Sequence, residues 1–179
     1  MSWRLSWYKA NKENPIVYEE ESYEMDNGET YIERCPIVNG DKVLWNEGTD
    51  IWCDMTKEEI NNPLYFREIL KEGEFEFHEV TKEGLKYFIE KYKERIIKIF
   101  EEALKSDDER HPFYPSLKQY AKEKLRNWKY NVCVDLRPCL DEDIYNVTND
   151  LSYEYCIFNL VALYKNFDFE NNMLVIHGG

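Results

Sequence analysis

Residues 73–88, GEFEFHEVTKEGLKYF, contain the change from strand-forming to helix-forming sequence that decides the fold. The first half alternates apolar and polar side chains, which predicts a β-strand with Phe75 and Phe77 on one face. The other face then carries three polar side chains, Glu74, Glu76 and His78. Alternate residues of a strand lie about 6.6 Å apart, so a metal would need further ligands from elsewhere. We expect a solvated face here; metal binding or acid–base chemistry is the alternative.

The second half of the stretch predicts a long helix that begins after Thr81. Threonine is a favoured N-cap residue, because its hydroxyl accepts a hydrogen bond from a free backbone N–H of the first turn. Apolar side chains then recur every three or four residues, the spacing of a helix with one buried side. They are Leu85, Phe88, Ile89, Tyr92, Ile96, Ile99, Phe100, Ala103 and Leu104.

The first 55 residues read as short strands and turns. Leu5 and Trp7 alternate with polar neighbours, which is the pattern of a half-buried strand. Asn-Gly pairs at 27–28 and 39–40 each lie between strand-like segments, and this dipeptide is typical of tight hairpin turns. We therefore expect an antiparallel meander with Trp45 and Trp52 in its core.

Helices are expected to follow the meander. Thr56 and Glu59 have the spacing of a capping box. Asn62-Pro63 resembles a helix start and Gly73 a helix end, which together predict a short helix over 63–72. Beyond the long helix we expect a loop over 106–115, a helix over 115–128, a strand over 132–136, a helix start at 141–143, an apolar helix over 155–164 and a strand or short hairpin over 167–177.

This order of elements predicts an α+β fold, in which an N-terminal antiparallel β-meander packs against three to four helices and a late C-terminal strand or hairpin follows. We expect a single domain over residues 1–179. Residues 1–80 would be mainly strands with short helices, and residues 81–179 mainly helical with a C-terminal strand.

Charge is distributed unevenly over the 179 residues, whose net charge is −13. Residues 1–81 carry −11, residues 82–129 carry +4 and residues 130–179 carry −6. Phosphate binding depends on Lys and Arg, so nucleic acid is a poor partner for the acidic parts and basic protein surfaces fit them better. The 14 tyrosines and 5 tryptophans add side chains that suit interfaces, because one end of each is polar.

Five cysteines without a C-x-x-C pair favour reduced, mostly buried thiols in a cytosol-like compartment. No apolar run approaches the roughly 20 residues that span a bilayer, and the N-terminus lacks the pattern of a signal peptide. We therefore expect a cytoplasmic protein without a membrane partner. Residues with AT-rich codons, such as Lys, Asn, Ile and Tyr, are abundant, which indicates a bacterial cell, including one infected by a phage.

Recognisable catalytic motifs are missing from the sequence. The three histidines are far apart, and no zinc-protease, nucleophile-elbow, Walker or dinucleotide-binding pattern occurs. Cys139 lies near three acidic residues, which favour its thiol over the reactive thiolate, whereas Arg137 and a helix N-terminus favour the thiolate. The direction of the net effect stays open, and we expect a structural cysteine. We name no catalytic residue, metal ligand or cofactor, although a Cys–His or Glu–His cluster assembled by the fold stays open.

The segment 18–24, YEEESYE, is the strongest candidate for a binding surface, because closely spaced carboxylates can dock on Arg and Lys clusters. The candidate partner-binding residues are Tyr18, Glu19, Glu20, Glu21, Tyr23, Glu24, Glu74 and Glu76. We favour a non-catalytic module that binds a protein with a basic surface, its sharpest form being a phage-encoded inhibitor of a host nucleic-acid-binding or defence protein. The alternatives are a small enzyme or small-ligand sensor with an unrecognised pocket, and nucleic-acid binding by the basic helices of residues 82–129.

Overall fold

The computed structural model describes residues 4–105 and 152–178. They fall into two compact units. The first unit contains residues 4–84 and 167–178, and the second contains residues 85–105 and 152–166. Each unit is described by itself.

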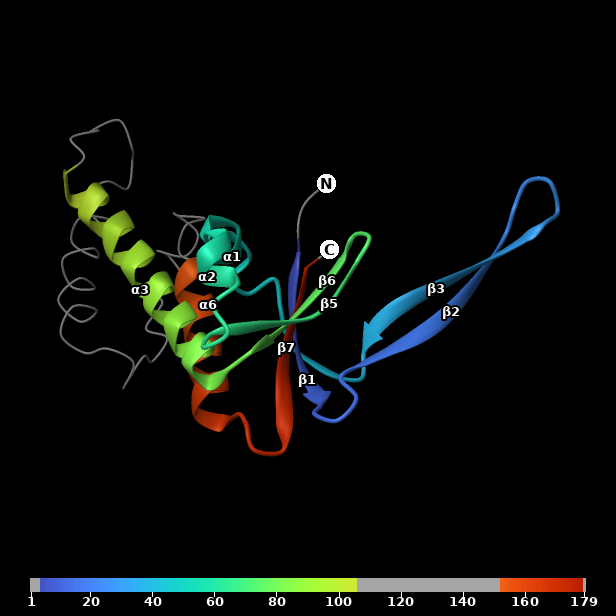
Figure 1. The fold of residues 1–179 in the computed structure, drawn as a ribbon. Helices are drawn as coiled ribbons and strands as arrows, with labels where there is room; N and C mark the ends of the chain where they lie inside the picture. The colour runs from blue at the N-terminus through green and yellow to red at the C-terminus, as the bar shows by residue number, and fades with distance from the viewer. Residues whose placement is uncertain (1–3, 106–151, 179) are drawn as a thin grey trace. The chain divides into compact units, whose positions relative to one another are not determined.

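A five-stranded antiparallel sheet forms the first unit, with the order β4-β1-β7-β6-β5 (Figure 1). Its strands are β1 (Leu5–Asn11), β4 (Gly40–Trp45), β5 (Phe66–Glu72), β6 (Phe75–Val80) and β7 (Asn172–Gly178). The expected C-terminal strand is confirmed, and it lies in the middle of the sheet between β1 and β6. The sheet is therefore complete only when β7 has paired with β1 and β6.

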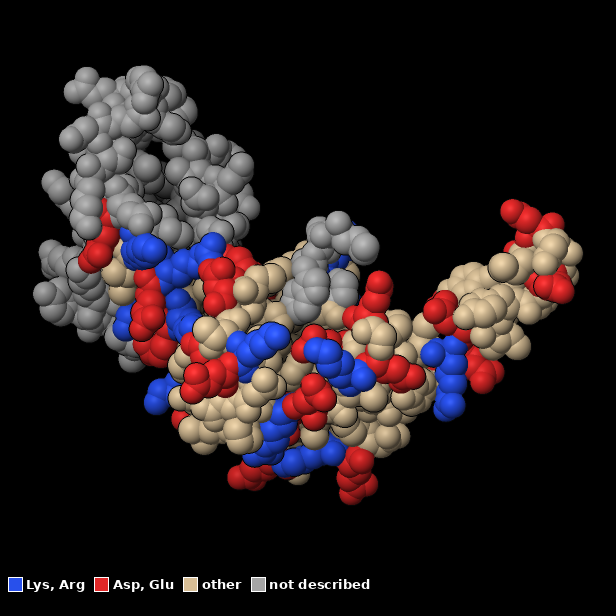
Figure 2. Space-filling model, turned by 45° about the horizontal axis from the view of Figure 1, so that its top comes forward, with Lys and Arg blue, Asp and Glu red and all other residues tan. Residues whose placement is uncertain are grey.

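The remaining strands, β2 (Ile16–Glu24) and β3 (Thr30–Val38), form a separate two-stranded sheet, which we call the arm (residues 16–38). Its turn lies at the predicted Asn-Gly pair, where the Gly28 N–H donates to the Met25 carbonyl at 2.8 Å. In Figure 1 the arm extends away from the five-stranded sheet, and Figure 2 shows it in space-filling form. Only its base packs against the sheet, where Val38 joins the buried cluster of Ala10, Phe77 and Val175.

The predicted meander is wrong at its second turn. Residues 39–40 do not connect a hairpin, because β4 pairs with β1 and not with β3. Gly40 is needed where the chain enters the sheet: a Cβ there would lie 2.1 Å from the Lys9 carbonyl oxygen. Trp45 is 49% exposed, so its predicted place in the core is also wrong, whereas Trp52 is buried as expected.

The predicted helix over 63–72 is a strand. Asn62 and Pro63 instead open a turn, in which the Tyr65 and Phe66 N–H groups both donate to the Asn62 carbonyl at 2.9 Å. The register of β5 against β6 shifts between Glu68 and Leu70, and this β-bulge moves the next apolar side chain to the opposite face. Apolar residues at 66, 69 and 70 therefore mimic helical spacing in a bulged strand.

One face of the sheet is covered by the short helix α1 (Thr49–Asp54). Trp52 of α1 lies edge-on to Phe66, with ring centroids 5.2 Å apart. The centroid of the His78 ring is 5.3 Å from that of Trp52. The buried side chains of this face include Leu5, Trp7, Phe66, His78, Val80, Leu174 and Ile176. The next helix, α2 (Lys57–Ile60), has the predicted capping box, because the Glu59 N–H donates to the Thr56 hydroxyl and the Thr56 N–H to the Glu59 carboxylate.

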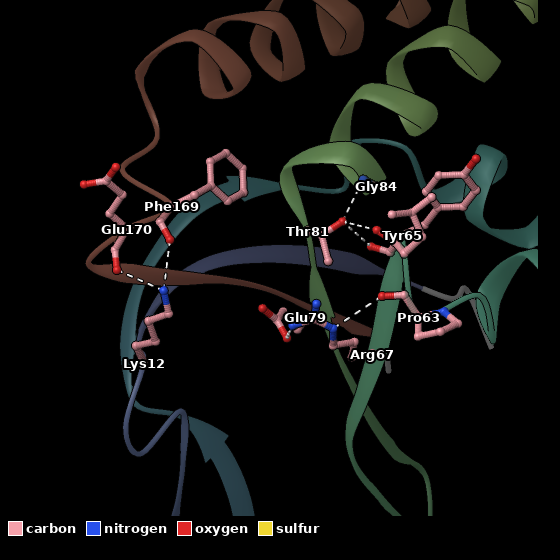
Figure 3. A network of polar contacts seen from close by, with 10 residues as sticks. Lys12, Pro63, Tyr65, Arg67, Glu79, Thr81, Gly84, Phe169 and Glu170 are labelled. Atoms are coloured by element: carbon pink, nitrogen blue, oxygen red, sulfur yellow. Dashed lines mark hydrogen bonds and ion pairs between the residues drawn. The ribbon is translucent and has the colours of Figure 1, made fainter.

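Thr81 connects the sheet to the long helix α3 (Lys82–Lys105), which begins as predicted (Figure 3). Its hydroxyl accepts from the Gly84 N–H at 2.9 Å and donates to the Leu64 carbonyl at 2.6 Å. Lys12 holds another loop of this unit by donating to the carbonyls of Phe169 and Glu170 at 3.1 and 2.9 Å.

The second unit contains most of α3 and the helix α6 (Ser152–Asn166), which confirms the predicted apolar helix over 155–164. The predicted apolar side of α3 is buried where its side chains are described, at Leu85, Phe88, Ile89 and Tyr92. The elements predicted between 106 and 151 lie outside the described residues, as does Cys139. Within residues 4–105 and 152–178, no helix is both long and apolar enough to cross a membrane.

Candidate functional site

The outer part of the arm, residues 18–34, is exposed and strongly acidic. It carries seven acidic side chains and one basic side chain, a net charge of −6. Figure 2 shows acidic atoms at its tip and along its length, with basic atoms only toward its base. Large apolar and aromatic side chains between the carboxylates are also exposed, namely Tyr18, Tyr23, Met25, Tyr31 and Ile32. Charge and exposed aromatic surface therefore occur together here.

The register of the arm divides the predicted residues between two faces. Glu21 lies opposite Glu33, and Tyr23 lies opposite Tyr31. With Glu19 they form one face, which we call the acidic tyrosine face (Glu19, Glu21, Tyr23, Tyr31 and Glu33). The other predicted residues of β2, Tyr18, Glu20 and Glu24, lie on the opposite face. Sequence reasoning treated them as one surface and missed the contribution of β3.

The acidic tyrosine face has no cation of its own, since the single basic residue of the outer arm, Arg34, lies on the other face. Glu21 and Glu33 are directly opposite each other, an arrangement that destabilises a strand pair. The Tyr23 hydroxyl donates to the Glu21 carboxylate, and this bond raises the pKa of Tyr23 to about 12. Tyr23 therefore stays neutral at ordinary pH, and the negative charge of the face is uncompensated.

The opposite face of the arm is held by internal contacts. The Arg34 guanidinium lies 4.4 Å from the centre of the Tyr18 ring and directly across from Glu20. The Tyr18 hydroxyl donates to the Glu72 carboxylate at 3.1 Å, which joins the arm to β5 and raises the pKa of Tyr18. This face is thus partly neutralised and attached to the sheet.

Glu74 and Glu76 do not lie on the arm. Glu74 is an exposed residue of the turn between β5 and β6. Glu76 is on β6, on the sheet face opposite to the one that the arm base covers. Its carboxylate oxygens lie 3.6 Å from Nζ of Lys71 and 3.5 Å from Nε2 of His78. It already has internal partners and is a weaker candidate than the carboxylates of the arm.

The predicted solvated face of β6 is wrong at His78, whose side chain is 2% exposed. Burial lowers the pKa of this imidazole, although the neighbouring Glu76 and Glu68 act in the other direction. Within the part of the chain that the structure describes, no three His, Cys, Asp or Glu side chains are placed to hold a metal ion. Glu76 and His78 therefore contact each other on the covered face of the sheet, whereas Glu74 lies in the exposed turn.

The cysteines and the aromatic residues of the basic segment can also be compared with the predictions. Cys35 and Cys53 are free thiols; Cys35 is half-buried and Cys53 is exposed, whereas mostly buried thiols were expected. Burial and the nearby carboxylates of Glu33 and Glu21 raise the pKa of Cys35. In residues 82–105, the described part of the basic segment, the aromatic rings of Phe88 and Tyr92 are buried and cannot stack on bases.

A groove on the sheet was not found by sequence reasoning. Its volume is about 390 Å³, and it lies on the sheet face that the arm base partly covers. The lining residues are Arg4, Ser6, Tyr8, Lys42, Trp45, Glu74, Phe75 and His177. They come from four strands, one turn and the residue before β1, so only the strand register could have grouped them.

No protein-family model, curated protein or solved structure matches this chain. Function must therefore be argued from the sites themselves.

Proposed function

We propose that this protein is a non-catalytic binding module that uses the acidic tyrosine face of the arm to bind a protein with a basic surface. The observation that carries the proposal is the directly opposed pair Glu21 and Glu33, next to the exposed pair Tyr23 and Tyr31. A Lys or Arg placed between the two carboxylates would remove their mutual repulsion. The tyrosine rings beside them would supply apolar contact area, which charge alone does not provide.

The form of the arm also supports a role in binding. An isolated two-stranded hairpin is only marginally stable in water. In the described part of the chain, β2 and β3 pair only with each other, so each has an outer edge with unpaired backbone groups. Such an edge can accept a further strand from a partner, while its glutamates discourage pairing with a second copy of the arm.

The sharper form of the proposal is an inhibitor encoded by a bacteriophage. Its target would be a host nucleic-acid-binding or defence protein whose basic surface normally meets phosphates. The acidic arm would occupy that surface, because spaced carboxylates can take the place of phosphate groups on Arg and Lys clusters. The AT-rich codon usage implied by the composition supports this origin.

Affinity purification from an AT-rich bacterial host, followed by mass spectrometry, tests the proposal. We expect the wild-type chain to recover a protein with a basic surface, and the complex to weaken as salt rises, because screening reduces attraction between exposed charges. The double variant Glu21→Lys/Glu33→Lys should lose this protein, with affinity lower by about tenfold or more. Tyr23→Ala/Tyr31→Ala should weaken the complex without changing its dependence on salt.

The matched control is Glu13→Lys/Glu58→Lys, which makes the same change in net charge at exposed sites outside the arm. It should bind like the wild type. Equal losses in the two charge-reversal variants would mean that net charge alone drives binding, and recovery of the same protein by the Glu21→Lys/Glu33→Lys variant would refute the proposed site.

A further inference from the structure

The groove on the five-stranded sheet is built by neighbouring positions of its strands. Ser6 lies opposite both Trp45 and His177, and His177 lies opposite Phe77. These residues therefore form one row across β4, β1, β7 and β6, on the face that does not carry His78. Phe75 and the turn residue Glu74 close one end of the row.

His177 lines the groove, and one polar atom of its ring is unsatisfied. Its Nδ1 is buried and has no hydrogen-bond partner among the described residues. The ring is held against Phe77, with centroids 4.3 Å apart. Burial and the nearby Lys42 lower the pKa of His177, so the ring is neutral at pH 7 and has one donor and one acceptor nitrogen. A buried polar atom without a partner is costly to the folded state.

Two cations lie at the same groove without a carboxylate partner among the described residues. The Lys42 ammonium is 3.7 Å from the centre of a Trp45 ring and 5.4 Å from that of Tyr8. The Arg4 guanidinium is 5.9 Å from Trp45. Both cationic groups are held in place by contact with aromatic ring faces, and their N–H donors remain available for a ligand. This is unusual in the first 81 residues, whose net charge is −11.

We propose that this groove binds a small organic anion that carries a flat ring. Its anionic group lies between Arg4 and Lys42, and its ring contacts Phe75 and Trp45. The volume of about 390 Å³ is within the usual range of small-ligand pockets. Glu74 at the rim disfavours a second anionic group. This site is separate from the acidic tyrosine face and does not depend on the function proposed for it.

Isothermal titration calorimetry of the full chain at low salt tests the site with two anionic probes. Adenosine 5′-monophosphate represents a nucleotide source and indole-3-acetate a carboxylate source, and adenosine and indole-3-acetamide are their uncharged counterparts. We expect at least one anionic probe to bind and its uncharged counterpart to bind about tenfold more weakly or not at all. Binding of neither anionic probe, or equal binding of the uncharged counterpart, overturns the proposal.

Variants locate the binding. Lys42→Met keeps an unbranched side chain beside Trp45 but removes the charge, and we expect it to weaken binding about tenfold, the usual effect of losing one charge-assisted hydrogen bond. Lys9→Met is the matched control, because Lys9 is exposed on the neighbouring strand β1 and on the opposite face of the sheet. Equal affinity in Lys42→Met and Lys9→Met overturns the assignment to this groove.

Discussion

At the scale of single residues, the two described histidines show how burial decides the role of a titratable group. His78 and His177 are on β6 and β7, where burial lowers the pKa of each imidazole. The sequence placed His78 beside two glutamates, which indicated a charged or metal-binding group. In the fold its ring contacts Trp52 instead, with centroids 5.3 Å apart. The acidic neighbours raise its pKa, but by less than burial lowers it.

These pKa shifts predict that the protein becomes less stable as pH falls through the histidine range. The unfolded chain binds protons at a pKa of about 6.5, whereas the folded imidazoles bind them only at lower pH. Between those pH values the unfolded state holds more protons, so the free energy of unfolding decreases as pH falls from 7.5 to 5.5. Urea denaturation at both pH values should show the loss, and His78→Gln should make it smaller. An unchanged pH dependence in this variant would show that His78 titrates normally.

At the scale of secondary-structure elements, three local signals in the sequence predicted the backbone correctly. Thr81, the capping box at Thr56 and the turn at residues 27–28 depend on side chain–backbone bonds or backbone conformation, and all three are confirmed. The helix predicted over 63–72 from Asn62-Pro63 and Gly73 failed, because Asn62 and Pro63 open a turn and residues 66–72 form β5. The partner of β4 and the central place of β7 depend on contacts between distant residues, which no local pattern contains.

The sign of the change in stability caused by Gly84→Ala distinguishes the effect of packing from that of helix propensity. It lies in the first turn of α3, where propensity alone predicts that alanine would stabilise the helix by about 1 kcal/mol. A Cβ at this position would lie 2.0 Å from the Tyr65 carbonyl oxygen, so the backbone would have to move (Figure 3). We expect Gly84→Ala to lower the free energy of unfolding by about 1–3 kcal/mol in urea denaturation. Its neighbour Glu83 is exposed, and Glu83→Ala should change stability by less than about 0.5 kcal/mol. A stabilised Gly84→Ala variant would contradict the close packing.

At the scale of the whole molecule, the outer arm and the five-stranded sheet of the first unit each contain one of the two proposed binding sites. Ile16 and Val38 at the base of the arm pack against the sheet, whereas its outer residues are exposed. The sequence predicted the acidic segment at 18–24 but not its division into two faces, since that needs the register against β3. Nor could it find the groove, whose residues come from positions 4–8, 42–45, 74–75 and 177. Sites built by strand register are hidden from a linear reading of the sequence.

Removing most of the outer arm should therefore leave the fold intact. Replacing residues 20–34 by Asn-Gly keeps the pairs that Tyr18 and Glu19 make with β3, and a two-residue loop then closes the shorter hairpin. The removed residues bury little apolar surface, and they include the opposed carboxylates Glu21 and Glu33. We expect the free energy of unfolding to change by no more than about 1 kcal/mol in urea denaturation, with the same cooperativity. The shortened chain should lose the basic protein partner but keep the affinity of the groove for its anionic ligand. A large loss of stability would mean that the outer arm belongs to the core, and retained partner binding would place the protein-binding surface elsewhere.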